Sequence, residues 1–291
     1  MTDIATTVRT TPAAPRAPEA TEPRAIAFRT RGRTHGPITR LVSPGDVGEL
    51  IKPFVFLDEF AVEGGRSGFG WHPHSGIATL TVLLDGAMRY EETTGASGVL
   101  EAGAVEWMRA GGGVWHTGGP HGDAGARGFQ LWVALPPSLE NAPCASRYLN
   151  ASEVPGEGPV RVILGSHLGV ASAIDAPSGM NYLVVNLAAG ERWTYDPPPG
   201  HTVAWIAVHQ GAVRTPALVG RGELAVFEAS NQALELVAEG ATQLVLGSAI
   251  PHPHPLVLGS YSVHTSEEAL ERGEAEIVRI RDEELRPRLE K

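Results

Sequence analysis

Two histidines separated by one proline, His72-Pro73-His74, form the short motif of this chain with the clearest capacity for chemistry. In an extended strand, residues two apart point to the same face, so both imidazoles can converge on one point. Pro73 restricts the backbone between them. One metal ion could accept a nitrogen from each ring. The alternative is that His72 and His74 are strand-end or surface residues, because such pairs also occur by chance in histidine-containing chains.

His116 is the third candidate ligand. It follows three consecutive glycines at 111–113 and precedes Gly118-Gly119-Pro120. Glycines permit tight turns that can aim a neighbouring side chain into a barrel. An H-x-H at the start of an apolar strand, followed by a further His after a Gly-rich turn, is typical of a small barrel whose mouth gathers ligands from separate strands. We therefore predict a metal site made of His72, His74 and His116.

Composition narrows the other possibilities. The single cysteine, Cys144, can form neither an intramolecular disulfide nor a cysteine-pair metal site, so any metal must rest on His and carboxylates. The 23 basic against 33 acidic side chains, a net charge of −10, argue against a protein that grips nucleic acid or an anionic membrane over a broad surface. Neither a phosphate-binding G-x-x-x-x-G-K-[ST] loop nor a G-x-S-x-G nucleophile elbow occurs. Without an apolar run of membrane-spanning length or a signal-peptide core, we expect a cytoplasmic protein.

Short strands must position these histidines. The 35 glycines and 23 prolines suit many turns, and short apolar runs punctuated by Gly and Pro favour strands over helices. Residues 79–84 end at Asp85-Gly86, a dipeptide that predicts a tight hairpin turn with residues 90–94 as the returning strand. The second half repeats this rhythm, which suggests an internal duplication.

We predict an all-β chain of two antiparallel barrels. Its parts would be a disordered tail over residues 1–25, a metal-binding barrel over 26–137, a linker over 138–158, and a second barrel with a short terminal helix over 159–291. The helix signal starts at Thr265, which has capping-box spacing to Glu268, whereas Gly273 weakens the helix. We expect this helix to return to the first half.

Several motifs, in order, resemble the pirin family of the cupin superfamily. They lie at residues 56–60 (FLDEF), 70–76 (GWHPHSG), 83–86 (LLDG), 103–111 (GAVEWMRAG) and 114–116 (VWH). The resemblance runs from about residue 26 to residue 135 and continues more weakly to the end, including residues 257–265. It implies a bicupin with a non-haem metal, usually iron, in the N-terminal barrel. Some pirins act as quercetin 2,3-dioxygenases, and others are described as nuclear or metabolic co-regulators.

The resemblance also implies a ligand set and two departures from it. Pirins hold the metal with the two His of H-P-H, a third His, and a Glu two residues beyond the third His. The three imidazoles match His72, His74 and His116, but Gly118 stands where the Glu should be. A second position that is usually acidic holds Ala78. The chain is thus identified as a divergent member whose pocket is expected to lack two carboxylates.

Three neutral imidazoles would leave a divalent ion with its full charge. This should favour Fe(II) over Fe(III) and leave coordination positions for water or a chelating substrate; Zn, with water as fourth ligand, or another divalent metal would also suit the site. His121 could supply a fourth ligand by a loop excursion, although a solvent-exposed loop histidine is the favoured interpretation.

Two functions of different class follow. One is a quercetin 2,3-dioxygenase-like oxygenase of a small aromatic flavonol or an enediol, with no catalytic residue assigned beyond Glu106 as a weak candidate base. The other is a non-catalytic regulatory or metabolite-binding protein whose acidic surface meets a protein partner, which the missing Glu at Gly118 favours.

A second H-P-H string, His252-Pro253-His254, does not correspond in position to the first. We interpret it as a polyproline-like connector. The equivalent place in the second barrel is nearer His201, and we expect that barrel to hold no metal. Among the aromatic residues, Trp107 is expected in the core, whereas Trp115 could equally line a substrate pocket or belong to the core.

Overall fold

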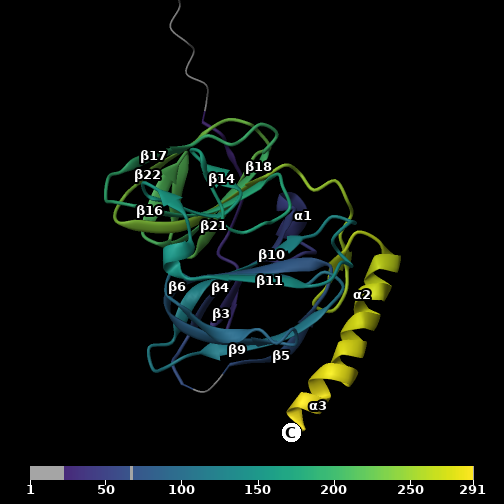
Figure 1. Ribbon diagram of the computed structural model, residues 1–291. Coiled ribbons are helices and arrows are strands. Elements are labelled where there is room, and N and C mark those ends of the chain that lie inside the picture. Colours follow the sequence, from purple (N-terminus) through teal and green to yellow (C-terminus); the bar gives the residue numbers. More distant parts are fainter. Residues whose placement is uncertain (1–22, 66–67, 291) are drawn as a thin grey trace, which may run out of the picture.

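The computed structural model describes residues 23–65 and 68–290, and residues 1–22 of the predicted tail lie outside this part. Two antiparallel β assemblies are stacked on one another, and a helix runs along the side of the first (Figure 1). This architecture confirms the predicted all-β bicupin with a short C-terminal helix. Within the described residues, no helix is long and apolar enough to cross a membrane.

The first half is built on a long antiparallel sheet whose strands lie in the order β11-β8-β6-β10-β4-β3-β2. A second layer is formed by β5, β9 and β7, which join this sheet through β6. The strands are β2 (Arg33–His35), β3 (Ile38–Val42), β4 (Phe54–Val62), β5 (Phe69–His74), β6 (Ile77–Glu92), β7 (Ser97–Glu101), β8 (Val105–Arg109), β9 (Val114–Pro120), β10 (Ala126–Ala134) and β11 (Ala145–Leu149).

Strand β6 overturns the predicted hairpin at Asp85-Gly86. The chain continues through this dipeptide as one strand, pairing with β8 and β10 before Gly86 and with β7 and β9 after it. Gly86 has φ +77°, and a Cβ there would lie 2.0 Å from the carbonyl oxygen of Gly125. The glycine therefore bends a strand from one layer into the next instead of reversing it, as a bulge does.

The second half contains a larger sheet in the order β1-β21-β18-β23-β16-β13-β12 and a smaller one in the order β17-β22-β19-β20. Their strands are β1 (Ile26–Thr30), β12 (Gly156–Glu157), β13 (Val160–Leu164), β16 (Met180–Leu187), β17 (Arg192–Tyr195), β18 (Val203–Gln210), β19 (Ala212–Thr215), β20 (Ala217–Gly220), β21 (Glu223–Phe227), β22 (Leu234–Ala238) and β23 (Thr242–Ala249). Two short ribbons pair β14 (Ser166–His167) with β15 (Val170–Ala171) and β24 (Val257–Leu258) with β25 (Val263–His264).

The strand pairing crosses the predicted domain boundaries. Strand β1, expected in the first barrel, pairs with β21 of the second half. Strand β11 lies in the predicted linker but extends the first sheet by pairing with β8. Arg24, placed in the predicted tail, is buried and donates hydrogen bonds to the carbonyl oxygens of Glu228 and Thr202. Sheet edges accept strands from distant segments, which local composition does not reveal.

The largest hydrophobic cluster lies between the two halves. It joins residues of the first sheet, such as Leu80 and Phe129, to residues of the second, such as Tyr182 and Trp205. The ring of Phe54 meets the ring of Trp205 edge-on at 5.5 Å. Because this interface is apolar and continuous, the two halves stabilise each other. The layer of β5, β7 and β9 belongs to the first half and lies outside the main path of its long sheet.

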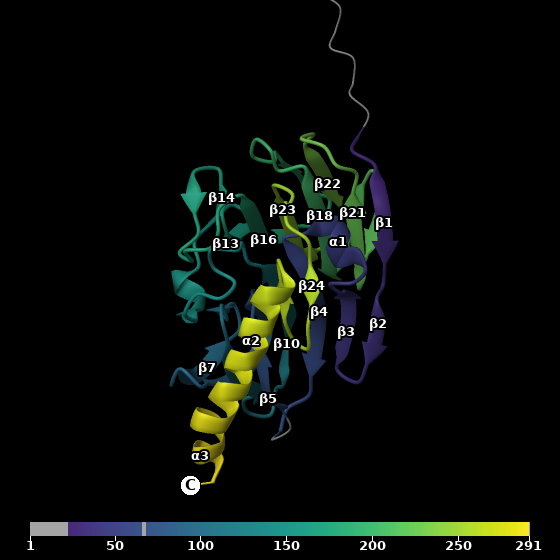
Figure 2. The same cartoon turned by 90° about the vertical axis from the view of Figure 1, so that its right-hand side faces the viewer.

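Helix α2 (Glu267–Ile280) follows the last ribbon and continues through a π-helical turn, Arg281–Leu285, into α3 (Arg286–Leu289). It runs along the first half, as expected (Figure 2). The helix begins two residues later than predicted, because Ser266 caps it by accepting from the backbone N–H of Ala269. Thr265 instead donates its N–H and its hydroxyl to the carboxylate of Glu140. The short helix α1 (Val47–Ile51) precedes β4.

Candidate metal centre

Strands β5 and β9 bring the three predicted histidines together. His72 and His74 share one face of β5, and the antiparallel register places His116 of β9 directly opposite His72. Pro73 is tolerated because β5 pairs with β9 alone, so this proline occupies an edge strand. The histidines are the one group of three or more potential metal ligands within the described chain, each offering a nitrogen within 4.8 Å of the others.

The rings are tightly clustered. Their centroids lie 4.3 Å apart for His72 and His116, 5.0 Å for His74 and His116, and 5.1 Å for His72 and His74. The Nε2 atoms of His74 and His116 are 3.1 Å apart. His74 and His116 are buried, and His72 is partly buried. Two imidazole nitrogens bound to one ion at about 2.1 Å lie roughly 3 to 3.4 Å apart, so the observed spacing fits a shared ion.

Each ring has an oxygen acceptor at its Nδ1 atom. The Nδ1 of His72 lies 2.7 Å from the carbonyl oxygen of Gly70, and that of His74 lies 3.2 Å from the carbonyl oxygen of Tyr261. The Nδ1 of His116 lies 3.7 Å from Oε1 of Glu106. Carbonyl oxygens only accept, so the neutral rings of His72 and His74 carry their proton on Nδ1, which leaves a lone pair on Nε2.

Burial favours the neutral form of His72 and His74. Loss of solvent, together with the neighbouring His116, lowers the pKa of His72 to about 4 and the pKa of His74 well below its ordinary value. Burial would raise the pKa of Glu106, but the nearby His116 and the hydroxyl of Thr81 outweigh it and hold that pKa below its usual range. His72 and His74 are therefore able to donate lone pairs at neutral pH.

The histidines open into a cavity of about 760 Å³. Its walls are rich in aromatic side chains: Phe56 and Trp132, whose rings stack at 4.0 Å, and Trp71, Tyr90 and Tyr261. A bidentate ion pair between Arg40 and Asp58 lies in the same wall, with the Arg40 guanidinium 3.9 Å above the ring of Phe56. An apolar cavity with few charged groups suits a flat organic molecule.

The segment between β24 and β25 closes one side of this cavity, a contribution that the sequence motifs did not indicate. Leu258, Gly259, Tyr261 and Ser262 line it, and Tyr261 adopts φ +65°, unusual for a residue other than glycine. Its backbone carbonyl orients His74, and its ring lies 5.9 Å from the ring of His72. The weak resemblance at residues 257–265 was the available signal.

Next to the site, Ser75, His264 and Glu140 form a chain of hydrogen bonds. Ser75 Oγ lies 3.0 Å from Nε2 of His264, whose Nδ1 lies 3.2 Å from Oε2 of Glu140. All three side chains are buried, and none lines the cavity. These hydrogen bonds tie the residue that follows strand β5 to the C-terminal segment. Gly273 of α2 packs against it, since a Cβ there would lie 2.6 Å from both Ser75 Oγ and His264 Nε2.

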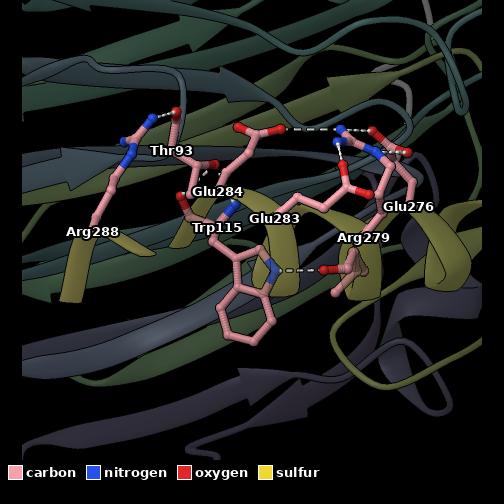
Figure 3. A network of polar contacts seen from close by, with 8 residues as sticks. Thr93, Trp115, Glu276, Arg279, Glu283, Glu284 and Arg288 are labelled. Carbon is pink, nitrogen blue, oxygen red and sulfur yellow. Dashed lines mark hydrogen bonds and ion pairs between the residues drawn. The ribbon is translucent and has the colours of Figure 1, made fainter. Parts of the chain in front are cut away.

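Strand β9 is also held by the C-terminal helix. The indole N–H of Trp115, adjacent to His116, donates to the carbonyl oxygen of Ile277 at 2.9 Å (Figure 3). Near the end of the chain, Arg288 donates to the carbonyl oxygen of Thr93 at 2.7 Å. Trp115 is half-buried, lies outside the cavity wall and the hydrophobic clusters, and contacts α2 instead. Trp107 lies in the core, as expected.

The other predicted residues are distributed as follows. Gly118 lines the cavity, so the carboxylate expected at this position is indeed missing from its wall. Ala78 does not line it: the side chain packs in the cluster between the two halves, which corrects the expectation of a second lost pocket carboxylate. His121 is exposed and outside the histidine cluster. His201 is buried in the second half, with Nδ1 3.0 Å from Ser248 Oγ.

Comparison with known proteins agrees with this architecture. The Pirin family model matches residues 37–133. A protein of Pseudomonas aeruginosa that bears the name "Putative quercetin 2,3-dioxygenase" is 35% identical over 71% of this chain and 75% of its own length. A pirin-like protein of Caulobacter vibrioides is 32% identical over 70% of this chain and 80% of its own length.

A solved structure gives the same result for the fold. The crystal structure of quercetin 2,3-dioxygenase from Acinetobacter baumannii superimposes with a TM-score of 0.82, covering 90% of this chain and 99% of that one at 23% identity. The family model matches part of the first half, and the sequence relatives and the fold extend this agreement over most of the chain. This chain belongs to the pirin family.

Proposed function

We propose that His72, His74 and His116 hold a divalent metal ion, with Fe(II) preferred, and that the protein is a quercetin 2,3-dioxygenase-like oxygenase of a flavonol or enediol. The observation that carries the proposal is the convergence of three imidazoles, each with a nitrogen within 4.8 Å of the others, and with the Nε2 atoms of His74 and His116 3.1 Å apart. Two nitrogens at this distance share either a proton or a metal ion, and a metal ion can also accept the third imidazole. When bound, Fe(II) would supply Lewis acidity and dioxygen chemistry to adjacent substrate oxygens.

The residues of this chain would bind and orient the substrate. The aromatic wall, with Trp71, Tyr90 and Tyr261, would hold a flat ring system, and the stacked Phe56 and Trp132 give the cavity a rigid surface. Gly118 leaves open space beside the histidines, where a pair of neighbouring substrate oxygens would approach. The relative named for quercetin 2,3-dioxygenase activity supports the same substrate class.

The missing carboxylate at Gly118 favours a second candidate. A pirin-like pocket that retains three imidazoles but lacks the anionic ligand would bind a metal or metabolite without turnover, as a regulatory protein that meets a protein partner through its acidic surface. The two candidates share the metal site and differ in catalysis.

The test is to measure bound metals by elemental analysis in protein purified without added metal and after Fe(II) loading, and then to follow oxygen consumption with quercetin. We expect one metal per chain and oxygen uptake that depends on quercetin. Stoichiometric iron without turnover of flavonols or simpler enediols would contradict the oxygenase function and favour the binding protein. Failure to take up any metal would contradict the three-histidine site itself.

A further inference from the structure

Glu106 is a buried carboxylate directly behind the histidine cluster. It lies on β8, between Thr81 of β6 and Tyr148 of β11 in the sheet register, and is 5% exposed. Its side chain reaches the cavity wall beneath His116. A carboxylate removed from water destabilises the fold unless it is paired or hydrogen-bonded, so its partners indicate its role.

The two carboxylate oxygens of Glu106 have different partners. Oε2 accepts a hydrogen bond of 2.6 Å from the hydroxyl of Thr81, which fixes the orientation of the carboxylate. Oε1 then lies 3.7 Å from Nδ1 of His116, on the opposite side of the ring from the Nε2 atom that faces His74. The separation is longer than a hydrogen bond but short enough for a direct electrostatic contact.

We propose that Glu106 is a positioning residue for the metal: it holds the proton of His116 on Nδ1, directs the Nε2 lone pair into the cluster, and supplies through the imidazole the negative charge that Gly118 does not provide. The inference rests on the proposed metal site. A carboxylate behind a metal-bound histidine fixes its tautomer and raises its basicity, and loss of such a group typically lowers metal affinity by about 10- to 100-fold.

The neighbouring buried carboxylate shows that this contact is specific. Glu92 is fully buried, and its side-chain partners are the hydroxyls of Tyr148, Ser146 and Thr94, with no imidazole among them. A matched control is offered by Glu59, whose Oε1 lies 2.7 Å from Nδ1 of His209. This second carboxylate–imidazole pair joins the two halves and lies outside the cavity wall.

The experiment compares wild type, Glu106→Gln and Glu59→Gln by Zn(II) affinity, measured by chelator competition, and by the visible spectrum of the Co(II)-loaded protein. Gln keeps the shape of Glu106 and can still bond to Thr81, so the variant removes charge with little change in packing. We expect Glu106→Gln to lose about 10- to 100-fold in Zn(II) affinity with a shifted Co(II) spectrum. Glu59→Gln should match wild type in both, because its imidazole binds no metal.

Two further variants separate positioning from stability. Thr81→Val keeps the charge but removes the hydroxyl that orients Glu106, so it should lower affinity in the same direction and by less. Gly118→Glu added to Glu106→Gln should restore affinity, because it returns an anionic ligand to the open position; a Cβ there meets the Arg89 carbonyl oxygen at 3.1 Å, a tight but small adjustment. A purely structural role would lower thermal stability and leave the Co(II) spectrum unchanged.

The outcomes are distinguishable. If Glu106→Gln folds and binds Zn(II) as tightly as wild type, the role of Glu106 is refuted while the three-histidine site stands. If Glu106→Gln and Glu59→Gln weaken binding equally, the effect is general and the role of Glu106 is again refuted. If wild-type protein takes up no metal, both the site and this role are refuted.

Discussion

The two His-Pro-His strings hold their rings at nearly the same separation, 5.1 Å between His72 and His74 and 5.2 Å between His252 and His254. The interplanar angles are also similar, 87° and 67°. Local spacing thus produces a histidine pair in both places. The pairs differ in what surrounds them.

The first string lies on a strand, and the second does not. Strand β9 places His116 opposite His72, whereas the second string has no third ligand near it among the described residues. Instead, Lys52 approaches: its ammonium donates to the carbonyl oxygen of His254. Burial, the neighbouring His254 and the Lys52 charge lower the pKa of His252 to about 4. A histidine pair therefore becomes a candidate metal site when the neighbouring strand supplies a third histidine. A nearby ammonium group disfavours the binding of a metal cation.

The largest expected difference between the strings is in metal affinity. His74→Ala removes a fully buried candidate ligand. Zn(II) affinity should therefore fall by more than about 100-fold, which exceeds the loss expected when only a group behind a ligand is removed. His254→Ala, the matched substitution in the second string, should leave affinity unchanged in the same chelator-competition titration. Equal losses in the two variants would show that the site has been misplaced.

Metal should also stabilise the fold through the first string alone. A ligand that binds only the folded state adds about 2.7 kcal/mol to the free energy of unfolding at 100 times its dissociation constant. We expect Zn(II) to raise the melting temperature of wild type and His254→Ala equally, and that of His74→Ala hardly at all, in differential scanning fluorimetry. The comparison fails if all three proteins respond alike.

The packing of helix α2 against Ser75 and His264, next to the first string, should have a smaller effect, and on stability. Gly273→Ala should raise helix propensity by about 1 kcal/mol in a free helix, yet here the added methyl would press on Ser75 Oγ and His264 Nε2. Such overpacking typically costs about 1 to 3 kcal/mol. Urea denaturation should therefore show a net loss of stability, whereas Glu271→Ala on the exposed face of α2 serves as a neutral control. A more stable Gly273→Ala protein would show that the helix does not clamp β5.

The smallest effect concerns the anchor beside His116. Trp115→Phe removes the indole N–H that bonds to the Ile277 carbonyl and should lower the free energy of unfolding by about 1 kcal/mol. Trp71→Phe, at a cavity-lining tryptophan, should change stability less. Hydrogen exchange of the α2 amides should speed up in Trp115→Phe and stay constant in Trp71→Phe; identical exchange would separate the helix from the metal strand.

The sequence predicted the histidine set because it depends on short-range rules. Alternation along a strand joins His72 to His74, and motif order adds His116. Short-range rules could not predict the hydrogen-bond partners of these rings, because the Tyr261 carbonyl that faces His74 is 187 residues away in the chain. Likewise, Asp85-Gly86 has the composition of a turn, yet the glycine serves as a bend because the surrounding sheets take up both sides of β6.

The two positions that lack the carboxylate of other pirins also differ in how far the sequence could predict their surroundings. At Gly118 the motif identified a true change in the cavity wall, because this residue lies two positions beyond His116 on the same strand and face. At Ala78 the motif showed that a usually acidic residue is absent, but it did not show which face of the strand this residue occupies. Strand alternation directs that side chain into the apolar cluster between the halves, while Thr81 faces the cavity. Which face a position occupies depends on the strand's start and register, and these became clear from the structure.

The most direct test of the comparison is a crystal structure of the metal-loaded protein with anomalous scattering recorded at the iron and zinc edges. We expect one anomalous peak, within coordination distance of an imidazole nitrogen of each of His72, His74 and His116, and none beside His252 and His254. A peak at the second string, or no peak at the first in crystals that contain stoichiometric metal, would contradict it.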